Sequence, residues 1–275
     1  MSPNTGLPTI TPDAPYRADI LLAHELANWA DEITTDRFWS PDLEVHTKAD
    51  MTPVTDADQR VEQLLCNKLA KTRPSDAIVG EEFGAHGSAN RTWVIDPIDG
   101  TKNFLRGVPV WATLIGLIED GQPVLGMVSA PAIGRRWWAA RGFGAYIGRS
   151  FTTGQPIHVS DISELADASF SCSSLGGWDK ADRLDQYVAL SRAVWRTRGY
   201  GDFWSYMMVA EGSVDIAAEP ELAFHDMAAV AAIVIEAGGR FTDTSGQVDG
   251  PFGKDALATN GILHDQALGF LAPRK

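Results

Sequence analysis

The spacing of apolar residues predicts two helices followed by a sheet of antiparallel strands in the first part of the chain. Residues 16–39 carry apolar side chains at helical spacing, and a second helix is expected directly after Thr55, its N-cap. The expected inward positions are Ile20, Ala23, Leu26, Ala27, Ala30 and Ile33, then Val61, Leu64, Leu65 and Leu69. Short apolar runs divided by turn residues then predict strands. These strands are expected at 77–79, 93–95, 110–118, 124–130, 136–140 and 145–147, with a hairpin turn at Asp120-Gly121.

After residue 150 the pattern changes to strands that alternate with helices. Strands are expected at 168–172, 196–198, 214–218, 239–242 and 256–259, and helices at 181–193, 202–211, 224–237 and 265–271. This alternation is typical of a mostly parallel sheet. We therefore predict an α/β fold with two lobes. Residues 1–150 form an α+β lobe with an antiparallel sheet, and residues 151–275 form an α/β lobe.

Residues 93–104, WVIDPIDGTKNF, combine features that an ordinary turn does not require. Asp96 ends a short buried strand, and Pro97 is expected to stop further strand pairing. Asp99 and Gly100 then form a turn, and Thr101 is expected to cap a short helix. Carboxylates bind hard cations such as Mg²⁺, and a helix start preceded by glycine binds phosphate. The loop therefore predicts a site for a metal ion and an anion together.

Composition narrows the class of protein further. The formal net charge of -13 argues against a nucleic-acid surface, which would be basic. No apolar stretch is long enough to predict a membrane span, and residues 1–15 are polar and proline-rich, which predicts a loose arm rather than a signal peptide. Two cysteines outside any CxxC motif favour reduced thiols and a cytoplasmic protein. We expect neither a nucleic-acid nor a membrane partner.

Three further acidic positions lie near the predicted element ends. Glu81 follows the strand at 77–79, and we expect that strand to pair with the strand that carries Asp96. Asp58 falls in the first turn of a helix, where a carboxylate also has a purely dipolar role. Asp226 opens an apolar helix, where a carboxylate is either a partner of the helix dipole or a metal ligand. The neighbouring His225 is assigned no role, because a histidine at a helix start more often packs or forms a hydrogen bond.

Taken together, three motifs resemble the inositol monophosphatase family. They are GEE at 80–82, WVIDPIDGTKNF at 93–104, and FHDMAA followed by EAGG within 224–239. They occur in the order typical of the family, over most of the chain. The resemblance implies a layered αβαβα fold, Mg²⁺-dependent hydrolysis of a small phosphate monoester by metal-activated water, and a homodimer.

The resemblance also implies roles for single residues. Glu81, Asp96 and the carbonyl of Ile98 match ligands of a first metal, and Asp96, Asp99 and Asp226 match ligands of a second. A third, weaker ion lies near Glu81 in such enzymes, so two or three Mg²⁺ are expected. The implied catalytic residues are Thr101, Asp58 and Glu81. Gly100 and Thr101 match phosphate-binding positions, and Asp202, Phe203 and Glu219 match positions that contact the organic part of the substrate.

The stretches RGYGDFW at 198–204 and RRWWAARGFGAY at 135–146 resemble the actinobacterial histidinol-phosphate phosphatase branch of the family. Asp202 replaces the small or hydroxyl residue of inositol-specific members, and with Glu219 it would pair with a cationic substrate. The predicted substrate is L-histidinol phosphate. Inositol 1-phosphate, sugar bisphosphates and 3'-phosphonucleotides remain alternatives. A non-catalytic metal-binding regulator predicts loss of Glu81, Thr101 or Asp226, and all three are present.

Overall fold

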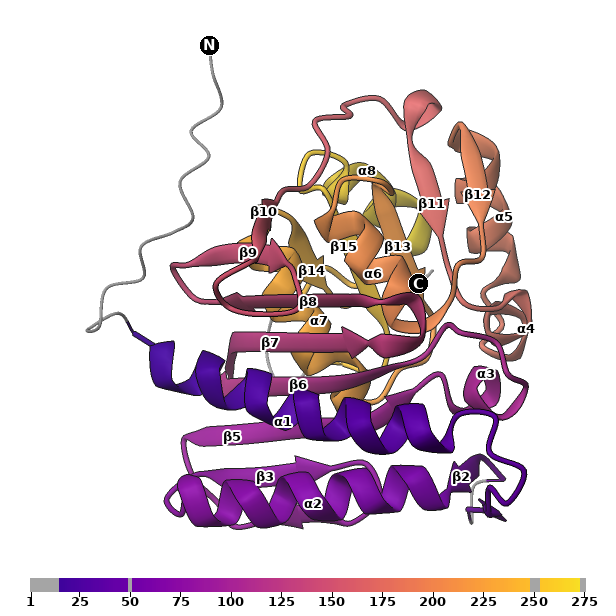
Figure 1. Cartoon of the computed structure of the whole chain (residues 1–275). Helices are drawn as coiled ribbons and strands as arrows, with labels where there is room; N and C mark the ends of the chain where they lie inside the picture. The colour runs from indigo at the N-terminus through magenta and orange to yellow at the C-terminus, as the bar shows by residue number, and fades with distance from the viewer. Residues whose placement is uncertain (1–14, 49–50, 248–252, 273–275) are drawn as a thin grey trace.

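In the computed structural model, residues 15–48, 51–247 and 253–272 are described, and they form two large β-sheets with helices between and outside them (Figure 1). The arm expected at residues 1–15 lies outside the described residues except for Pro15. None of the helices in the described part of the chain combines the length and apolar character that a membrane span requires.

Helices and sheets alternate in five layers. Two long helices cover the outer face of the first sheet, two lie between the sheets, and three cover the outer face of the second. In that order the helices are α1 (Arg17–Arg37) and α2 (Asp56–Thr72), α6 (Asp202–Ala210) and α7 (Phe224–Glu236), then α4 (Leu175–Lys180), α5 (Leu184–Ala193) and α8 (His264–Leu271). The predicted αβαβα architecture is confirmed.

The first sheet has eight strands in the order β10-β9-β8-β7-β6-β5-β3-β4. Its strands are β3 (Ala77–Gly80), β4 (Gly84–His86), β5 (Arg91–Asp99), β6 (Ala112–Glu119), β7 (Gln122–Ala130), β8 (Arg135–Ala140), β9 (Gly144–Ile147) and β10 (Gln155–Ile157). All neighbours are antiparallel except β3 and β5, which are parallel. The strands β4 and β10 were not expected. Since β10 carries the sheet past residue 150, the position of a lobe boundary stays a prediction.

The second sheet is mixed, so the expectation of a mostly parallel sheet is wrong. Its order is β12 (Arg196–Arg198), β11 (Ser169–Ser171), β13 (Ile216–Glu219), β15 (Ala256–Thr259) and β14 (Arg240–Thr242). The pairs β11–β12 and β11–β13 are parallel, whereas β13–β15 and β14–β15 are antiparallel. A parallel return requires a long crossover, usually a helix, and the described residues between β14 and β15 contain none.

Several smaller expectations need correction. The helix expected at 181–193 begins at Leu184, as α5, because Asp182 has φ 56° and cannot belong to a right-handed helix. The short helix α4 before it was not expected. Leu64, expected to face inward, is 37% exposed, since the buried side of α2 follows Val61, Leu65 and Leu69. The remaining elements are the hairpin of β1 (Val45–Thr47) and β2 (Pro53–Thr55), the helix α3 (Thr101–Leu105), and two 3₁₀ turns at Pro131–Ile133 and Leu165–Asp167.

The first sheet is buried on both faces, as its pair of adjacent tryptophans illustrates. Trp137 packs into the core that contains α6 and α7, and Trp138 packs into the core beneath α1 and α2. The two rings therefore lie on opposite faces of the sheet. Because residues alternate sides along a strand, the apolar residues 137–140 of β8 contribute to two cores.

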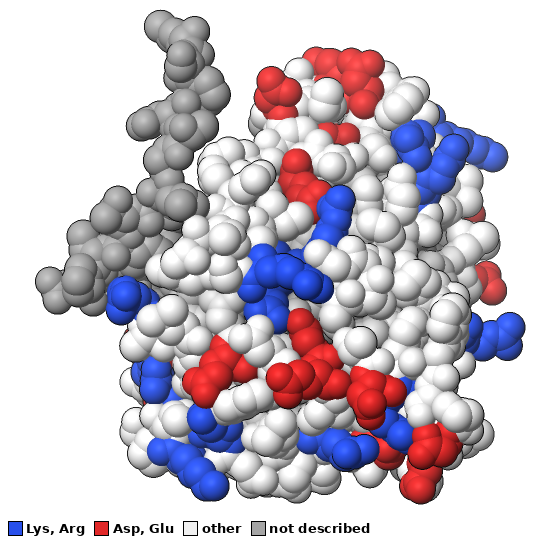
Figure 2. Space-filling model, in the orientation of Figure 1, with Lys and Arg blue, Asp and Glu red and all other residues white. Residues whose placement is uncertain are grey.

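Charges of both signs lie next to one another on the surface that Figure 2 draws. Ion pairs of this kind join α1, α2 and β5, where Asp19 lies 2.8 Å from both Arg73 and Arg91. Such partly exposed pairs are each worth about 1 kcal/mol or less. Although the formal net charge is -13, acidic side chains on this part of the protein are paired with arginines.

Candidate active site

The strand β5 presents Asp96 and Asp99 at its carboxyl end, on either side of an irregularity. Pairing with β6 shifts by one residue between Asp96 and Asp99, so Pro97 does not end the strand as expected. The hydroxyl of Thr113 donates to the Pro97 carbonyl at 2.8 Å, and the Ile98 side chain is fully buried. Bulges of this kind redirect side chains. Here the bulge lies directly between the two carboxylates.

The turn after β5 depends on Gly100. This residue has φ 85° and is the N-cap of α3, so Thr101 is the first helical residue and not the cap that we expected. A Cβ at position 100 would lie 2.8 Å from the Val110 carbonyl, which adds a steric requirement to the conformational one. The Thr101 hydroxyl donates to the Ile98 carbonyl at 3.0 Å.

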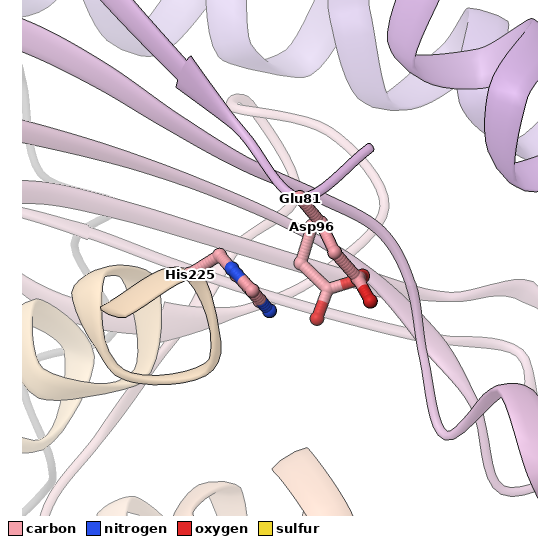
Figure 3. Close-up of side chains that lie close together, drawn as sticks. All are labelled: Glu81, Asp96 and His225. Carbon is pink, nitrogen blue, oxygen red and sulfur yellow. The ribbon is translucent and has the colours of Figure 1, made fainter. Parts of the chain in front are cut away.

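Glu81 reaches the same place from the neighbouring strand. Its backbone N–H donates to the Ile95 carbonyl at 3.2 Å, which continues the parallel pairing of β3 with β5 by one residue. In Figure 3 its side chain and that of Asp96 point into the same space. The expectation that Glu81 lies near Asp96 is confirmed. Lys48 lies 2.6 Å from Glu81 Oε1 and 2.6 Å from Glu82 Oε1.

The start of α7 supplies Asp226 and His225 from the opposite side. Ligand atoms of Asp96, Asp99 and Asp226 lie within 4.8 Å of one another, as do those of Glu81, Asp96 and His225. Asp96 therefore belongs to both groups. Figure 3 shows His225 directed from the helix toward Glu81 and Asp96, so our assignment of no role to His225 missed a residue of this cluster.

The electrostatics of the cluster reflect crowded negative charge. Burial raises the pKa of Asp96 well above the usual range, and Glu81, Asp99 and Asp226 raise it further. Burial, then Asp202 and Asp226, raise the pKa of Asp99 in the same way. One pKa unit corresponds to about 1.4 kcal/mol between the two protonation states. Without a cation, the folded protein therefore disfavours full ionisation of this cluster.

The donor set fits a hard divalent cation. It consists mainly of carboxylate oxygens, which are the ligands that Mg²⁺ prefers. Asp96 Oδ1 is buried and accepts no hydrogen bond from the described residues, so a ligand position remains open on an otherwise enclosed group. A buried acceptor without a partner is costly, and a bound cation removes that cost.

Asp58 lies on α2, close enough to Glu81 and Glu82 that, after burial, their charges also raise its pKa. It is fully buried, and its Oδ2 accepts hydrogen bonds from the N–H and hydroxyl of Thr55 at 2.8 and 2.6 Å, which confirms Thr55 as the N-cap of α2. Burial raises its pKa to about 7 despite these bonds. Among the described residues no hydrogen bond joins Asp58 directly to Thr101, whose hydroxyl is directed to Ile98.

The second sheet and α6 bring Asp202 and Glu219 to the edge of the cluster. Asp202 has φ 49° and is the first residue of its helix, whose N-cap is Gly201. Asp202 Oδ2 accepts from the Asn103 side-chain amide at 2.7 Å. Glu219, at the end of β13, is buried and accepts from the Ser173 backbone N–H. Burial raises the pKa of Asp202 to about 6 and that of Glu219 to about 7.

Phe203 takes a different position from the one expected for a substrate contact. Its side chain is 2% exposed and packs against Trp137, with ring centroids 6.0 Å apart. Its backbone N–H donates to Asp99 Oδ2 at 2.7 Å. Phe203 therefore joins α6 to a carboxylate of the cluster through its main chain, and its ring belongs to the core.

Lys48, Asn103, Ser173 and His225 were not assigned by sequence reasoning, although each contacts a predicted site residue or lies within the cluster. His225 had a visible signal, its place beside Asp226 at a helix start, and Asn103 lies within the motif at 93–104. Lys48 and Ser173 come from segments distant in sequence, and their contacts arise only from the tertiary fold.

Comparison with known proteins gives concordant matches. A profile of the inositol monophosphatase family matches residues 18–272. A histidinol-phosphatase of Streptomyces coelicolor is 59% identical over 94% of this chain and 98% of its own length. A histidinol-phosphatase of Mycobacterium tuberculosis is 53% identical over 91% of this chain and 96% of its own length. Among solved structures, an inositol monophosphatase from Zymomonas mobilis superposes with a TM-score of 0.83 at 32% identity, covering 94% of this chain and all of that one.

Proposed function

The chain belongs to the inositol monophosphatase family, and from this premise we propose that it is a Mg²⁺-dependent phosphomonoesterase that hydrolyses L-histidinol phosphate to L-histidinol and phosphate. The observation that carries the reaction class is the position of Asp96 in two adjoining groups of ligand atoms. The relatives named histidinol-phosphatase support the substrate.

The proposed metal ligands are Glu81, Asp96, Asp99, Asp226 and the Ile98 carbonyl. When bound, divalent cations lower the pKa of a water molecule and neutralise charge on phosphate oxygens. The enclosed carboxylates hold their positions before the metal arrives, since Asp99 and Asp226 each accept a backbone hydrogen bond at 2.7 Å. Such preorganisation keeps the cost of reorganisation during the reaction low.

The proposed phosphate contacts are Gly100 and Thr101 at the start of α3. The positive φ of Gly100 turns the chain so that the helix begins immediately after the carboxylates. Backbone N–H groups at a helix start favour a negatively charged group. In this arrangement the phosphate lies between donor groups of the backbone and the metal ligands.

Thr101, Asp58 and Glu81 are the proposed catalytic residues. The Thr101 hydroxyl donates a hydrogen bond to the Ile98 carbonyl at 3.0 Å, which leaves its oxygen free to accept a hydrogen bond from the attacking water. The pKa of Asp58, raised by burial to about 7, suits a proton acceptor at neutral pH.

Asp202 and Glu219 are the proposed contacts for the organic part of the substrate. Histidinol phosphate carries an amine and an imidazole, whereas inositol is uncharged at the same end. Glu219, which is buried, and Asp202, which is half-buried, favour the cationic group through charge-assisted hydrogen bonds. For Phe203 the proposed contribution is its backbone, given the buried side chain.

The proposal includes two or three Mg²⁺ per site, a homodimer and a cytoplasmic location. The family resemblance supports the ion number and the dimer. Cys66 and Cys172 are free thiols, which are usual in cytoplasmic proteins. Equilibrium titration with Mg²⁺ counts the ions, sedimentation measures the dimer, and cell fractionation tests the location.

A panel of phosphate monoesters assayed with Mg²⁺ tests the function. We expect the highest kcat/KM for histidinol phosphate, ahead of inositol 1-phosphate, fructose 1,6-bisphosphate and a 3'-phosphonucleotide, and no turnover in EDTA. Asp96→Asn is expected to lower kcat/KM by roughly 10³-fold or more, since it removes a ligand common to both metal groups. Full activity in EDTA would exclude a metal-dependent reaction, and a preference for another panel member would reassign the substrate.

A further inference from the structure

A fully buried carboxylate outside the cluster contacts the loop that carries Glu81. Glu62 lies on α2, one helical turn after Asp58, and its side chain is inaccessible to solvent. Its Oε2 accepts from the Glu82 backbone N–H and its Oε1 from the Phe83 backbone N–H, each at 2.8 Å. Both oxygens are therefore directed to the backbone of the two residues that follow Glu81.

Gly80 makes room for this carboxylate. A Cβ at position 80 would lie 1.8 Å from Glu62 Oε1 and 2.3 Å from its carboxyl carbon. A Cβ essentially never lies within 3 Å of an atom to which it is not bonded, so the carboxylate would have to shift. Gly80 is the last residue of β3, so the absence of a side chain there lets α2 contact the end of the strand directly.

These contacts fix Glu81 from both sides along the chain. The backbone N–H of Glu81 donates to the Ile95 carbonyl of β5. The backbone N–H groups of the next two residues donate to the Glu62 carboxylate. The backbone between these anchors has little freedom to rotate, so the Glu81 side chain is held toward Asp96 (Figure 3). Charge-assisted hydrogen bonds to a buried carboxylate are stronger than neutral ones.

We propose that Glu62 is a positioning residue for the metal site: its carboxylate fixes the loop of residues 80–83 so that Glu81 faces Asp96. This inference rests on the proposed function in one respect, that Glu81 binds the metal. Neither group of candidate ligand atoms in the described residues includes Glu62. Glu62 is therefore not itself a ligand, and in this proposal it acts on the ion through the backbone around Glu81.

The test measures Mg²⁺ binding by calorimetry without substrate, in the full chain. Glu62→Gln keeps the size of the side chain but replaces one acceptor oxygen with an NH₂ group. This NH₂ group is a donor that faces a backbone N–H, so one of the two hydrogen bonds is lost. Gly80→Ala leaves Glu62 and every candidate ligand intact while displacing the carboxylate. Loss of an outer hydrogen-bond partner typically weakens metal binding by about 10- to 100-fold, and we expect this range for both variants.

Leu69→Val is the matched control for a general loss of stability, because Leu69 is fully buried on the same helix and far along it from the loop. We expect it to lower the melting temperature but to leave the Mg²⁺ affinity unchanged. Hydrogen exchange gives a second readout. The amides of Glu82 and Phe83 should exchange faster in Glu62→Gln, and amides in the rest of α2 should not.

Mg²⁺ affinity within twofold of wild type in Glu62→Gln and Gly80→Ala would overturn the proposal, as would equal weakening in Leu69→Val. Unchanged affinity in Glu81→Gln would also overturn it, because Glu81 would then not be a ligand. These outcomes are independent of the phosphatase assay. A wild-type protein that binds Mg²⁺ but hydrolyses no phosphate ester would contradict the proposed function alone.

Discussion

Among single residues, Asp202 has the most unusual backbone in the candidate site. It is a non-glycine residue with φ 49° at the start of α6, held by a bond from its N–H to the Ser173 hydroxyl at 2.8 Å. Aspartate and asparagine tolerate the left-handed region better than other residues with a side chain. The conformation places a carboxylate beside the amide of Asn103, at the edge of the cluster.

Asp202→Asn separates the charge of this residue from its geometry. Asparagine tolerates the same φ, and its oxygen can still accept from Asn103, so the start of α6 should be preserved. We expect KM for histidinol phosphate to rise by roughly 10-fold or more, the value of a charge-assisted hydrogen bond. Turnover of a phosphate ester with an uncharged organic end should change little. Equal losses for both substrates in steady-state kinetics would argue against a role in recognising charge.

The buried carboxyl groups predict how stability depends on pH in the metal-free protein. Burial raises the pKa of Asp58 to about 7 and that of Glu219 to about 7, whereas unfolded carboxyls titrate near 4. Between these values the folded state binds protons that the unfolded state has lost. The contribution of these groups to stability should therefore be greatest below about pH 4, fall as the pH rises from 4 to 7, and level off above that.

The slope is about 1.4 kcal/mol per pH unit for each such group. Urea denaturation in EDTA between pH 5 and 8 measures it, and Mg²⁺ should flatten the curve because it favours ionised ligands. A metal-free stability that rises over this range would contradict the assignment of raised pKa values to these carboxyls.

Among the elements, α7 lies unusually close to the first sheet, because two strand residues that face it are glycines. A Cβ at Gly126 of β7 would lie 2.1 Å from the Ala229 carbonyl, and one at Gly116 of β6 would lie 2.8 Å from the Ala228 Cβ. The two glycines are paired across the strands. The close approach they allow brings the first turn of α7, with Asp226, to the ends of β3 and β5.

Gly126→Ala should therefore affect both stability and the metal site. The added methyl group pushes α7 away from the sheet, and overpacking of this kind costs about 1–3 kcal/mol. We expect a lower denaturation midpoint and weaker Mg²⁺ binding, because Asp226 moves with the helix. Gly269→Ala is the control: it lies in α8 with no atom within 4 Å of the new Cβ, and it should be neutral or slightly stabilising. Weaker stability without weaker Mg²⁺ binding would show that the position of α7 and the site are independent.

At this scale, the sequence predicts well those elements that are determined by residues close together in the chain. The helices α1, α2 and α7 and the hairpin at Asp120-Gly121 follow from apolar spacing and turn residues, and both turn residues have positive φ as such a hairpin requires. The bulge at Pro97 was not predicted, because it is a property of the pairing of β5 with β6, where the Thr113 hydroxyl donates to the Pro97 carbonyl. For the same reason the contact of Glu62 with the Glu81 loop cannot be read from the residues of either segment alone.

For the whole molecule, the order of the layers brings the candidate ligands together from positions 81 to 226. The ends of β3 and β5 belong to the first sheet, while α7 lies between the two sheets. The bond from Phe203 N–H to Asp99 ties α6 into the same place. A cation held here therefore crosslinks the first sheet to the helical layer that supports the second.

Mg²⁺ should consequently stabilise the entire fold. At about a hundred times its dissociation constant, a ligand that binds only the folded state adds about 2.7 kcal/mol, which raises the melting temperature by roughly 5 to 10 °C in a chain of this size. Asp226→Asn should lose most of this shift, because it removes the ligand from the helical layer. Asp265→Asn, an exposed aspartate on α8, should keep it. Calorimetric scans of the three proteins in Mg²⁺ and in EDTA make the comparison. A wild-type melting temperature that is the same in both would mean that the carboxylates do not join the layers through a metal, whatever their distance from one another.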